Sequence, residues 1–388
     1  MIFPAMNKIF ASSTVLALGA LALSGCTDNT AAATSDGSIS VVSTADACTV
    51  STDTAAGGTL RFNVKNEGTA VTEFYLLAED GLRIVGEVEN IGPGVSRDLV
   101  VMAPEGKYFT ACKPGMVGDG IRAAFTVTAG SGNSEVSADR ASLQKTATDQ
   151  YKAYVKEQAE QLLRGTEKFA QAFAAGDEEL AKSLYAPTRM HWERIEPIAE
   201  SFGDLDPILD AREADLEKGD EFTGWHRAEK DLWAATGAQK MTKAQRTEIA
   251  DGLVKNTKEL YARTAKLEFT PDQLANGAKS LLDEVATGKV TGEEEIFSHT
   301  DLWDFQANVE GAKIAYEDLQ PLLTDSDSAL DEQLKKNFAA LQKQLDAYRV
   351  GDGFKYYQEL SDAQVKELAA GVDALSEPLS KLTAAVVK

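Results

Sequence analysis

The feature that most constrains this chain is a change in hydrophobic period near residue 130. From Ser38 to Ala129, apolar residues alternate with polar ones, as at Leu60, Phe62 and Val64, and turns containing Gly or Pro separate the runs. Such alternation predicts β-strands with one buried face. Beyond Ser142 the alternation stops, and long stretches rich in Ala, Glu, Lys, Leu and Gln begin, as is typical of helices. We therefore expect a β part followed by an all-α part.

Five segments follow from this pattern and from the amino terminus. They are a signal peptide at 1–25, a tether at 26–37, a small β-sandwich of about seven strands at 38–129, a polar linker at 130–142 and an all-α bundle at 143–388. One helix is expected through Tyr151–Phe173. Further helices are expected around 177–185, 189–201, 224–236, 242–267, 271–286, 301–323, 327–349 and 361–385.

The amino terminus has the pattern of a secretory signal. Lys8 precedes an apolar run, Ile9–Leu23, which is too short for a good membrane-spanning helix. The run ends in Leu23-Ser24-Gly25-Cys26, which resembles a bacterial lipobox. The resemblance implies that Cys26 becomes the lipidated first residue of an extracytoplasmic protein anchored to the bacterial cell membrane.

The charge balance restricts the class of partner. The chain has 39 basic and 61 acidic residues, for a net charge of −22. This argues against a nucleic-acid-binding protein, which needs a basic face, and it suits a protein that handles cations. Three cysteines and three histidines exclude a disulfide-rich scaffold and a histidine-rich metal array.

All three histidines lie in stretches rich in carboxylates. These stretches are His191–Pro197, Gly224–Glu229 and Gly292–Asp304. On helices, Glu193 and Glu196 would share a face, and so would His226 and Glu229. Helical bundles hold metal ions with such pairs, and an oxygen-rich site with one imidazole suits iron, manganese or calcium. The pattern leaves two alternatives open: a metal-binding bundle, or solvated acidic faces with histidines hydrogen-bonded in the core.

Two cysteines of the β part leave two alternatives open. Cys48 and Cys112 can form a disulfide in an oxidising compartment, which would close a loop of about 65 residues and stabilise the fold by about 4 kcal/mol. They can instead form a metal site with nearby carboxylates such as Glu73, Glu87 and Glu89. The two alternatives exclude each other, because a bridged pair supplies no thiolate.

The segment Pro104–Met116 resembles the end of a cupredoxin, in which a strand delivers a Cys and the next loop supplies His and Met. Cys112 and Met116 are present here, but residues 38–129 contain no histidine. A blue-copper site needs two His and one Cys. Electron transfer of the usual cupredoxin kind is therefore excluded.

Several longer stretches, in this order, resemble the EfeO family of bacterial iron-uptake proteins. They are Leu184–Arg189, His191–Glu200, Phe222–Lys230 and Ser298–Gly311. The resemblance covers the whole mature chain and implies a cupredoxin-like domain followed by an imelysin-like helical domain. In the β part the match is looser, and it rests on Cys48, Asn90–Gly94 and Cys112.

The resemblance also implies an iron site in the helical domain. Its His-x-x-Glu motif corresponds to His226 and Glu229. A carboxylate site is implied at Glu193 and Glu196, with Asp210 as a companion and a further Glu from the 293–295 stretch. The expected metal ligands are therefore Glu193, Glu196, Asp210, His226, Glu229, Glu293 and Glu294.

The function implied by the resemblance is that of an iron-binding component of an uptake system. Its partners would be a membrane iron permease, which receives the iron, and a secreted haem peroxidase of the dye-decolourising type. The β part is expected to bind copper or ferric iron, or to dock partners. No activity as an enzyme is expected, since the chain has no His-Glu-x-x-His and no Gly-x-Ser-x-Gly. The alternatives are a metallopeptidase or metal oxidase, and a structural lipoprotein that binds cations weakly.

Overall fold

The computed structural model describes residues 37–77, 79, 84–116, 120–130, 138–235 and 239–387. The expected signal peptide, most of the tether and Cys26 lie outside these residues. Among the described helices, none has the length and apolar character needed to cross a membrane.

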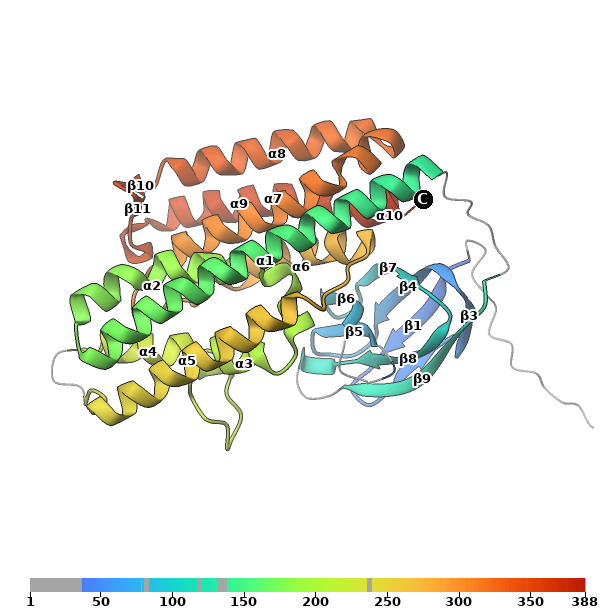
Figure 1. The fold of residues 1–388 in the computed structure, drawn as a ribbon. Coiled ribbons are helices and arrows are strands. Elements are labelled where there is room, and N and C mark those ends of the chain that lie inside the picture. Colours follow the sequence, from blue (N-terminus) through green and yellow to red (C-terminus); the bar gives the residue numbers. More distant parts are fainter. Residues whose placement is uncertain are drawn as a thin grey trace, which may run out of the picture. The chain divides into compact units, whose positions relative to one another are not determined.

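The β part forms two sheets (Figure 1), with strand orders β2-β1-β4-β7 and β3-β9-β8-β5-β6. Two pairs, β1 with β4 and β3 with β9, are parallel, and the others are antiparallel. The strands are β1 (Ile39–Ser43), β2 (Cys48–Val50), β3 (Thr54–Ala56), β4 (Gly58–Asn66), β5 (Thr72–Leu77), β6 (Ile84–Ile91), β7 (Ser96–Ala103), β8 (Gly106–Cys112) and β9 (Ile121–Thr128).

The core of the β part lies between the two sheets. Alternate residues of β4 are buried, and Phe62 packs against Phe74 of β5 and Phe125 of β9, with ring centroids 5.3 and 5.6 Å apart. Because successive side chains of a strand point to opposite faces, the period-two pattern places this apolar set on one side of each sheet. The predicted sandwich is confirmed.

A disulfide joins Cys48 of β2 to Cys112 of β8, with Cα atoms 5.5 Å apart. The bridge links the two sheets, since β2 and β8 belong to different ones. The alternative of a copper or iron site built on two free thiolates is therefore wrong, because bridged sulfurs carry no thiolate charge. Glu73, which was expected to assist such a site, is buried and pairs with Lys113 at 3.4 Å.

Beyond residue 137 the described chain is almost entirely helical, which confirms the all-α expectation. The helices are α1 (Ala138–Ala175), α2 (Glu178–Glu193), α3 (Leu205–Asp210), α4 (Gly224–Leu232), α5 (Lys243–Thr264), α6 (Pro271–Thr287), α7 (Asp301–Ser326), α8 (Ser328–Asp346), α9 (Asp362–Leu379) and α10 (Leu382–Val386). Short 3₁₀ turns are η1 (Pro114–Met116), η2 (Glu196–Phe202), η3 (Glu213–Asp215), η4 (Lys289–Thr291) and η5 (Tyr357–Glu359), and a small hairpin pairs β10 (Arg349–Val350) with β11 (Gly353–Phe354).

Helix α2 differs from the prediction. Separate helices were expected at 177–185 and 189–201, but α2 runs through Pro187 and ends at Glu193. Proline normally breaks a helix at a cost of about 3 kcal/mol. Here Tyr185 and Ala186 before it, and Thr188 after it, are buried in the bundle core, so packing offsets that cost. Glu193 and Glu196 consequently lie on different elements, α2 and η2.

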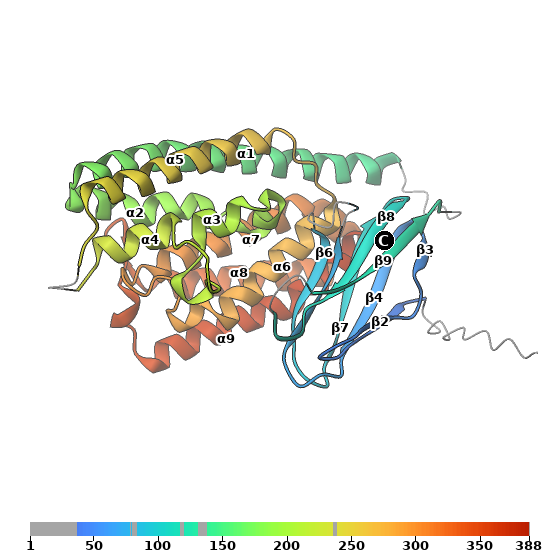
Figure 2. The ribbon, with the colours of Figure 1, turned by 90° about the horizontal axis from the view of Figure 1, so that it is seen from below.

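Two other helix boundaries also differ from the prediction. Helix α1 begins at Ala138, inside the segment 130–142 that was expected to be a linker. The helix expected at 361–385 is divided into α9 and α10. Helix α1 packs along α2 and α5, so that its long apolar stripe is covered by both neighbours (Figure 2).

Helix α6 joins the helical part to the β part. The Asp272 carboxylate accepts the backbone N–H of Met102 at 2.8 Å, and the Asn276 amide donates to the carbonyl of Val100 at 3.1 Å. Both backbone groups belong to β7. These bonds hold β7 against α6, and the neighbouring strand β6 also contacts α6, which brings carboxylates of β6 near the centre of the helical part.

One buried carboxylate ties α7 to α8 and gives a prediction for acid stability. Asp331 accepts hydrogen bonds from Tyr316, Gln320 and Thr324 of α7, and from Lys335. Burial opposes the charge, but these hydrogen bonds outweigh it and lower the Asp331 pKa to about 2. A depressed pKa contributes stability that is present above the unfolded value near 4 and is lost as the pH falls towards 2.

We therefore expect Asp331→Asn to lower the free energy of unfolding by about 1–2 kcal/mol at neutral pH and to change it little near pH 2. Urea unfolding at the two pH values measures this difference. The control is Glu332→Gln, which removes a charge from a neighbouring side chain that is 76% exposed. An equal loss at both pH values would contradict the assignment of this stability to the Asp331 charge.

Candidate metal centre

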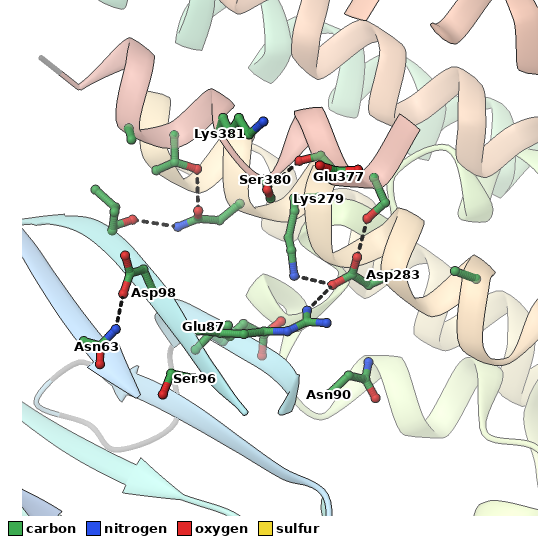
Figure 3. A pocket seen from close by; sticks show the side chains of 18 of the residues that line it. Asn63, Glu87, Asn90, Ser96, Asp98, Lys279, Asp283, Glu377, Ser380 and Lys381 are labelled. Carbon is green, nitrogen blue, oxygen red and sulfur yellow. Dashed lines mark hydrogen bonds and ion pairs between the residues drawn. The ribbon is translucent and has the colours of Figure 1, made fainter. Parts of the chain in front are cut away.

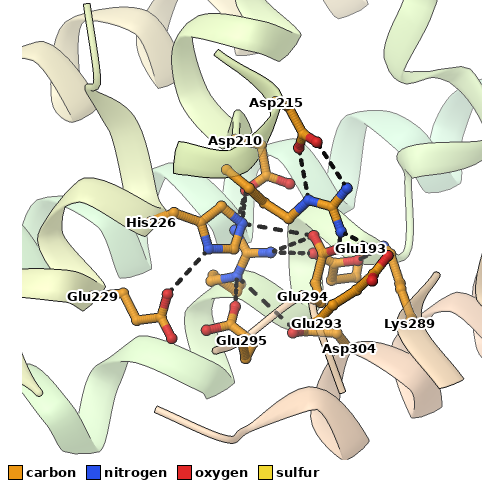
Figure 4. A network of polar contacts seen from close by, with 12 residues as sticks. Glu193, Asp210, Asp215, His226, Glu229, Lys289, Glu293, Glu294, Glu295 and Asp304 are labelled. Carbon is orange, nitrogen blue, oxygen red and sulfur yellow. Dashed lines mark hydrogen bonds and ion pairs between the residues drawn. The ribbon is translucent and has the colours of Figure 1, made fainter. Parts of the chain in front are cut away.

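The centre of the helical part is His226 on α4, which is only 2% exposed. Its Nδ1 lies 3.2 Å from Oε2 of Glu229. Its Nε2 lies 3.6 Å from Oδ1 of Asp210 and 3.6 Å from Oε1 of Glu294 (Figure 4). Nε2 is buried and has no hydrogen-bond partner among the described residues. A ring nitrogen therefore faces two carboxylate oxygens.

The ends of two short helices hold this arrangement. Asp210 is the last residue of α3, and the indole N–H of Trp192 donates to its Oδ2 at 2.7 Å. Gly224 begins α4 with a φ of +76°, and a Cβ there would lie 2.2 Å from the Leu209 carbonyl oxygen. Only glycine allows this approach. The end of α3 and the start of α4 therefore touch, and this contact sets Asp210 beside His226.

Glu229 orients the imidazole. Its Oε1 accepts the backbone N–H groups of Phe297 at 3.0 Å and Ser298 at 2.7 Å, while its Oε2 faces Nδ1 of His226. Metal-bound histidines commonly have such a carboxylate on the second ring nitrogen. The same bonds tie α4 to the segment that carries Glu294. Glu229 is therefore placed to fix the ring and to leave Nε2 facing Asp210 and Glu294.

The charge of His226 depends on these neighbours. Burial opposes protonation, and so does the nearby Arg189, but the hydrogen bond with Glu229 and the facing carboxylate of Glu294 outweigh both and raise the His226 pKa to about 10. In the ion-free protein the ring is thus a cation at neutral pH. A metal ion that binds Nε2 would take the place of a proton there.

The structure separates the three consecutive glutamates of the 293–295 stretch. Glu294 is buried and faces His226, as described above. Glu293 has a side chain that is 52% exposed and pairs with Arg212 at 3.4 Å. Glu295 is buried, and its carboxylate contacts Arg189 at 2.7 Å and accepts from the Tyr185 hydroxyl at 3.3 Å.

Glu193 and Glu196 are held by internal cations instead of facing His226. Nη2 of Arg189 lies 2.6 Å from Oε1 of Glu193, and Arg189 also pairs with Asp210. Nζ of Lys289 lies 2.7 Å from Glu193 and 2.6 Å from Glu196. Sequence analysis did not identify these two cations. Arg189 stands in a stretch that carries the family resemblance, whereas nothing in the local sequence singles out Lys289.

Only one of the three histidines reaches the centre. Nδ1 of His191 lies 2.8 Å from Oε1 of Gln158, and burial together with the charge of Arg194 lowers the His191 pKa to about 4. His299 has a positive φ of 60°, and its carbonyl accepts the backbone N–H of Tyr357. The clustering of histidines with carboxylates in the sequence therefore predicted which part of the chain holds the site. Only the family resemblance, through its His-x-x-Glu motif, singled out His226 among the three histidines.

A cavity of about 310 Å³ adjoins Asp210 and Glu294. It is lined by carboxylates from both parts of the chain, namely Glu87, Glu89, Glu196, Asp206, Asp210, Asp215, Glu284 and Glu294. Burial, with the charges of Glu87 and Glu73, raises the Glu89 pKa to about 9. Two of the three carboxylates expected at the cysteines, Glu87 and Glu89, thus line the approach to the helical centre.

A second cavity, of about 730 Å³, lies between β4, β7 and α6 and contains none of the residues around His226 (Figure 3). Three of its four basic side chains are paired within it, and the fourth is Lys381. Arg97 and Lys279 contact Asp283, and Arg61 contacts Asp98. We therefore place the candidate site at His226.

The donor set fits a hard or borderline metal ion. Atoms of Asp210, His226 and Glu294 lie within 4.8 Å of one another, and so do atoms of His226, Glu229 and Glu295. Two carboxylate oxygens and one imidazole nitrogen suit iron or manganese. Asp210 and Glu294 of the first group line the acidic cavity, although Asp210 also pairs with Arg189. In the second group, Glu229 accepts two backbone N–H groups, Glu295 pairs with Arg189, and neither carboxylate lines that cavity. The first group is therefore the better candidate.

Comparison with known proteins finds relatives that share most of this chain. The model of the imelysin family matches residues 147–382. An Efem/EfeO family lipoprotein of Staphylococcus haemolyticus is 47% identical over 247 residues, which is 63% of this chain and 84% of that protein. The iron uptake system component EfeO of Yersinia pestis is 39% identical over 85% of this chain and 86% of its own. The component of the same name from Escherichia coli O1:K1 is 37% identical over 89% and 90%.

Proposed function

The chain belongs to the EfeO family and contains an imelysin domain, and from this premise we propose that it is an iron-binding component of a bacterial iron-uptake system. It would capture iron outside the cytoplasm and pass it on, without catalysing a reaction. The relatives from Yersinia pestis and Escherichia coli are named as components of iron uptake systems. The sequence has no His-Glu-x-x-His, the helical motif that holds a catalytic zinc.

One observation carries this proposal. Nε2 of His226 is buried without a hydrogen-bond partner among the described residues, and it faces Oδ1 of Asp210 and Oε1 of Glu294, each at 3.6 Å. A buried polar atom normally has a hydrogen-bond partner, and a ring nitrogen that instead faces two carboxylate oxygens can share a metal ion with them. We propose that Asp210, His226 and Glu294 bind the iron directly and that Glu229 orients the ring.

The surroundings support the capture of a cation. The cavity beside Asp210 and Glu294 is lined by eight carboxylates and a single arginine, Arg212. Closely spaced carboxylates in a cleft attract cations and raise their local concentration. The approach to the site is therefore rich in carboxylate oxygens, which suits an ion that arrives from solution and leaves again.

Location and delivery are further parts of the proposal. Cys26 would be lipidated and would hold the protein on the outer face of the cell membrane, with the residues up to 37 as a flexible tether. A membrane permease would receive the iron, and a haem peroxidase of the dye-decolourising type would be a second partner. These expectations rest on the lipobox and on the family resemblance.

Two adjacent glutamates provide the test. We expect Glu294→Gln to weaken Fe(II) binding by about 100-fold or more, since loss of a ligand should exceed the 10–100-fold cost of losing an outer partner. Glu293→Gln removes the same charge one residue away, and we expect it to change the affinity by less than about twofold. Anaerobic calorimetric titration of the full chain measures both.

The same titration separates specific binding from general acidity. If Glu293→Gln and Glu294→Gln weakened Fe(II) binding equally, this result would contradict the proposed site. Equal and weak binding of iron, calcium and zinc by the unaltered protein would contradict the proposed function. His226→Gln keeps a polar side chain of similar length, and we expect it to weaken Fe(II) binding as strongly as Glu294→Gln does.

A further inference from the structure

Lys289 occupies the point at which Glu193 and Glu196 meet. Its Nζ lies 2.7 Å from Oε2 of Glu193 and 2.6 Å from Oε2 of Glu196. The lysine side chain is 1% exposed, and the two glutamates are 0% and 12% exposed. An ammonium group is a compact point charge that proteins seldom bury. Here it bridges two carboxylates in the way that a bound metal ion would.

The oxygen atoms of this pair converge from two elements. Nδ2 of Asn308, on α7, donates to the same two atoms, at 3.0 Å to Oε2 of Glu193 and 2.7 Å to Oε2 of Glu196. It also lies 3.0 Å from the carbonyl oxygen of Glu193. The amide therefore holds the two carboxylates side by side, and the lysine supplies the cation that this arrangement requires.

A rigid turn delivers the lysine. Lys289 begins the 3₁₀ turn η4, in which the N–H of Gly292 bonds to the Lys289 carbonyl at 3.0 Å. Gly292 has a φ of +76°, and a Cβ there would lie 2.5 Å from the ring of Tyr357. The hydroxyl of Tyr357 in turn donates to the carbonyl of Val290. The contacts of Tyr357 with Val290 and Gly292 therefore hold the turn that begins at Lys289.

The lysine and the proposed iron site share this segment and a network of charges. Glu294 follows Lys289 in the same loop, between η4 and α7. Glu193, which Lys289 neutralises, also contacts Arg189, and Arg189 contacts Asp210. A cation at the Glu193–Glu196 pair would thus lie in the same buried network as one at His226.

We propose that Lys289 is an internal competitor that occupies the Glu193–Glu196 pair and must be displaced before a metal ion can bind there. The inference rests on the proposed function, in which the network around His226 holds iron. Without the lysine, Oε2 of Glu193 and Oε2 of Glu196 would both face the position that Nζ now occupies. The lysine therefore lowers the affinity of this pair for metal ions, which suits a protein that must release its cargo.

Lys289→Met tests the competition, since methionine fills similar volume without charge. The probe is Mn²⁺, an oxygen-preferring ion that is stable in air, and equilibrium dialysis of the full chain gives its count and affinity. We expect the variant to bind one more Mn²⁺ per chain than the unaltered protein, or to bind it about tenfold more tightly. Unchanged count and affinity would overturn the inference.

Lys335→Met is the matched control. Lys335 also contacts two carboxylates, at 2.8 and 3.1 Å, but its side chain is 45% exposed and lies on α8, away from His226. Its loss should leave Mn²⁺ binding unchanged. Glu196→Gln/Lys289→Met removes one charge of each sign from the pair, and we expect it to lose the additional ion. Retention of that ion in the double variant would place it elsewhere and overturn the inference.

Two further comparisons keep the result interpretable. If Lys289→Met does not fold, Lys289→Gln keeps a donor for the carboxylates without the charge, and the same gain in Mn²⁺ binding is expected. The difference in Mn²⁺ binding between Lys289→Met and the unaltered protein tests the role of Lys289. The loss of iron binding in His226→Gln, a variant that keeps Lys289, tests the proposed function. A gain on removing Lys289 without any effect of His226→Gln would support the competitor and contradict the iron site.

Discussion

Replacing Arg189 with methionine is expected to lower the free energy of unfolding by about 3–5 kcal/mol. Arg189 is fully buried and contacts the carboxylates of Glu193, Asp210 and Glu295, and it lies within 4.0 Å of two more carboxylates, those of Glu294 and Asp304. Removing one partner of a buried ion pair leaves the other charges uncompensated in a medium that solvates them poorly. Here one cation pairs with several carboxylates, so its loss leaves an excess of negative charge at the centre of the bundle.

Urea unfolding at neutral pH measures this loss. Arg164→Met is the control, since Arg164 pairs with Glu160 at 2.5 Å on the surface of α1 and its side chain is 63% exposed. Exposed pairs of this kind contribute about 0–1 kcal/mol. We also expect Mn²⁺ to stabilise Arg189→Met more than the unaltered protein, because the ion would bind the uncompensated carboxylates of the native state. A loss of stability no larger than that of Arg164→Met would contradict this account.

The second large effect is expected at Gly224, which does not contact iron in the proposed site. Its φ is +76°, and an added Cβ would lie 2.2 Å from the Leu209 carbonyl oxygen and 2.7 Å from that of Ile208. Both are backbone atoms, so no side-chain rotation relieves the contact. Gly224→Ala should therefore push the start of α4 away from the end of α3. We expect a loss of about 3 kcal/mol or more in stability, from the positive φ and the overlap together.

The same displacement should separate His226 from Asp210 and weaken iron binding by about tenfold or more, even in molecules that remain folded. Thermal unfolding and calorimetric titration measure the two effects. Gly252→Ala is the control, because Gly252 lies inside α5 and an added Cβ there meets nothing within 4 Å. We expect that change to stabilise the protein by about 0.5–1 kcal/mol. Normal iron affinity in Gly224→Ala would show that the contact between α3 and α4 does not position the site.

The roles of Arg189 and Gly224 depend on contacts that the local sequence does not reveal. The pattern correctly predicted a β-sandwich followed by helices, because period-two and helical patterns are local and each reports one face of one element. It placed a break near Pro187, where α2 instead continues. The choice there depends on burial against other helices, which the residues next to the proline do not reveal.

The sequence by itself determined the classes of element, the acidity and the residue types that could hold a metal ion. His226 with Glu229, three residues apart on α4, is a local pair of this kind. Only the tertiary structure decided that Glu294, and not Glu293, faces His226, and that Lys289 occupies the Glu193–Glu196 pair. The physical reason is that a buried charge must find its partner in space. Partners such as Lys289 and Glu196 come from segments far apart in the chain, so no local pattern records their pairing.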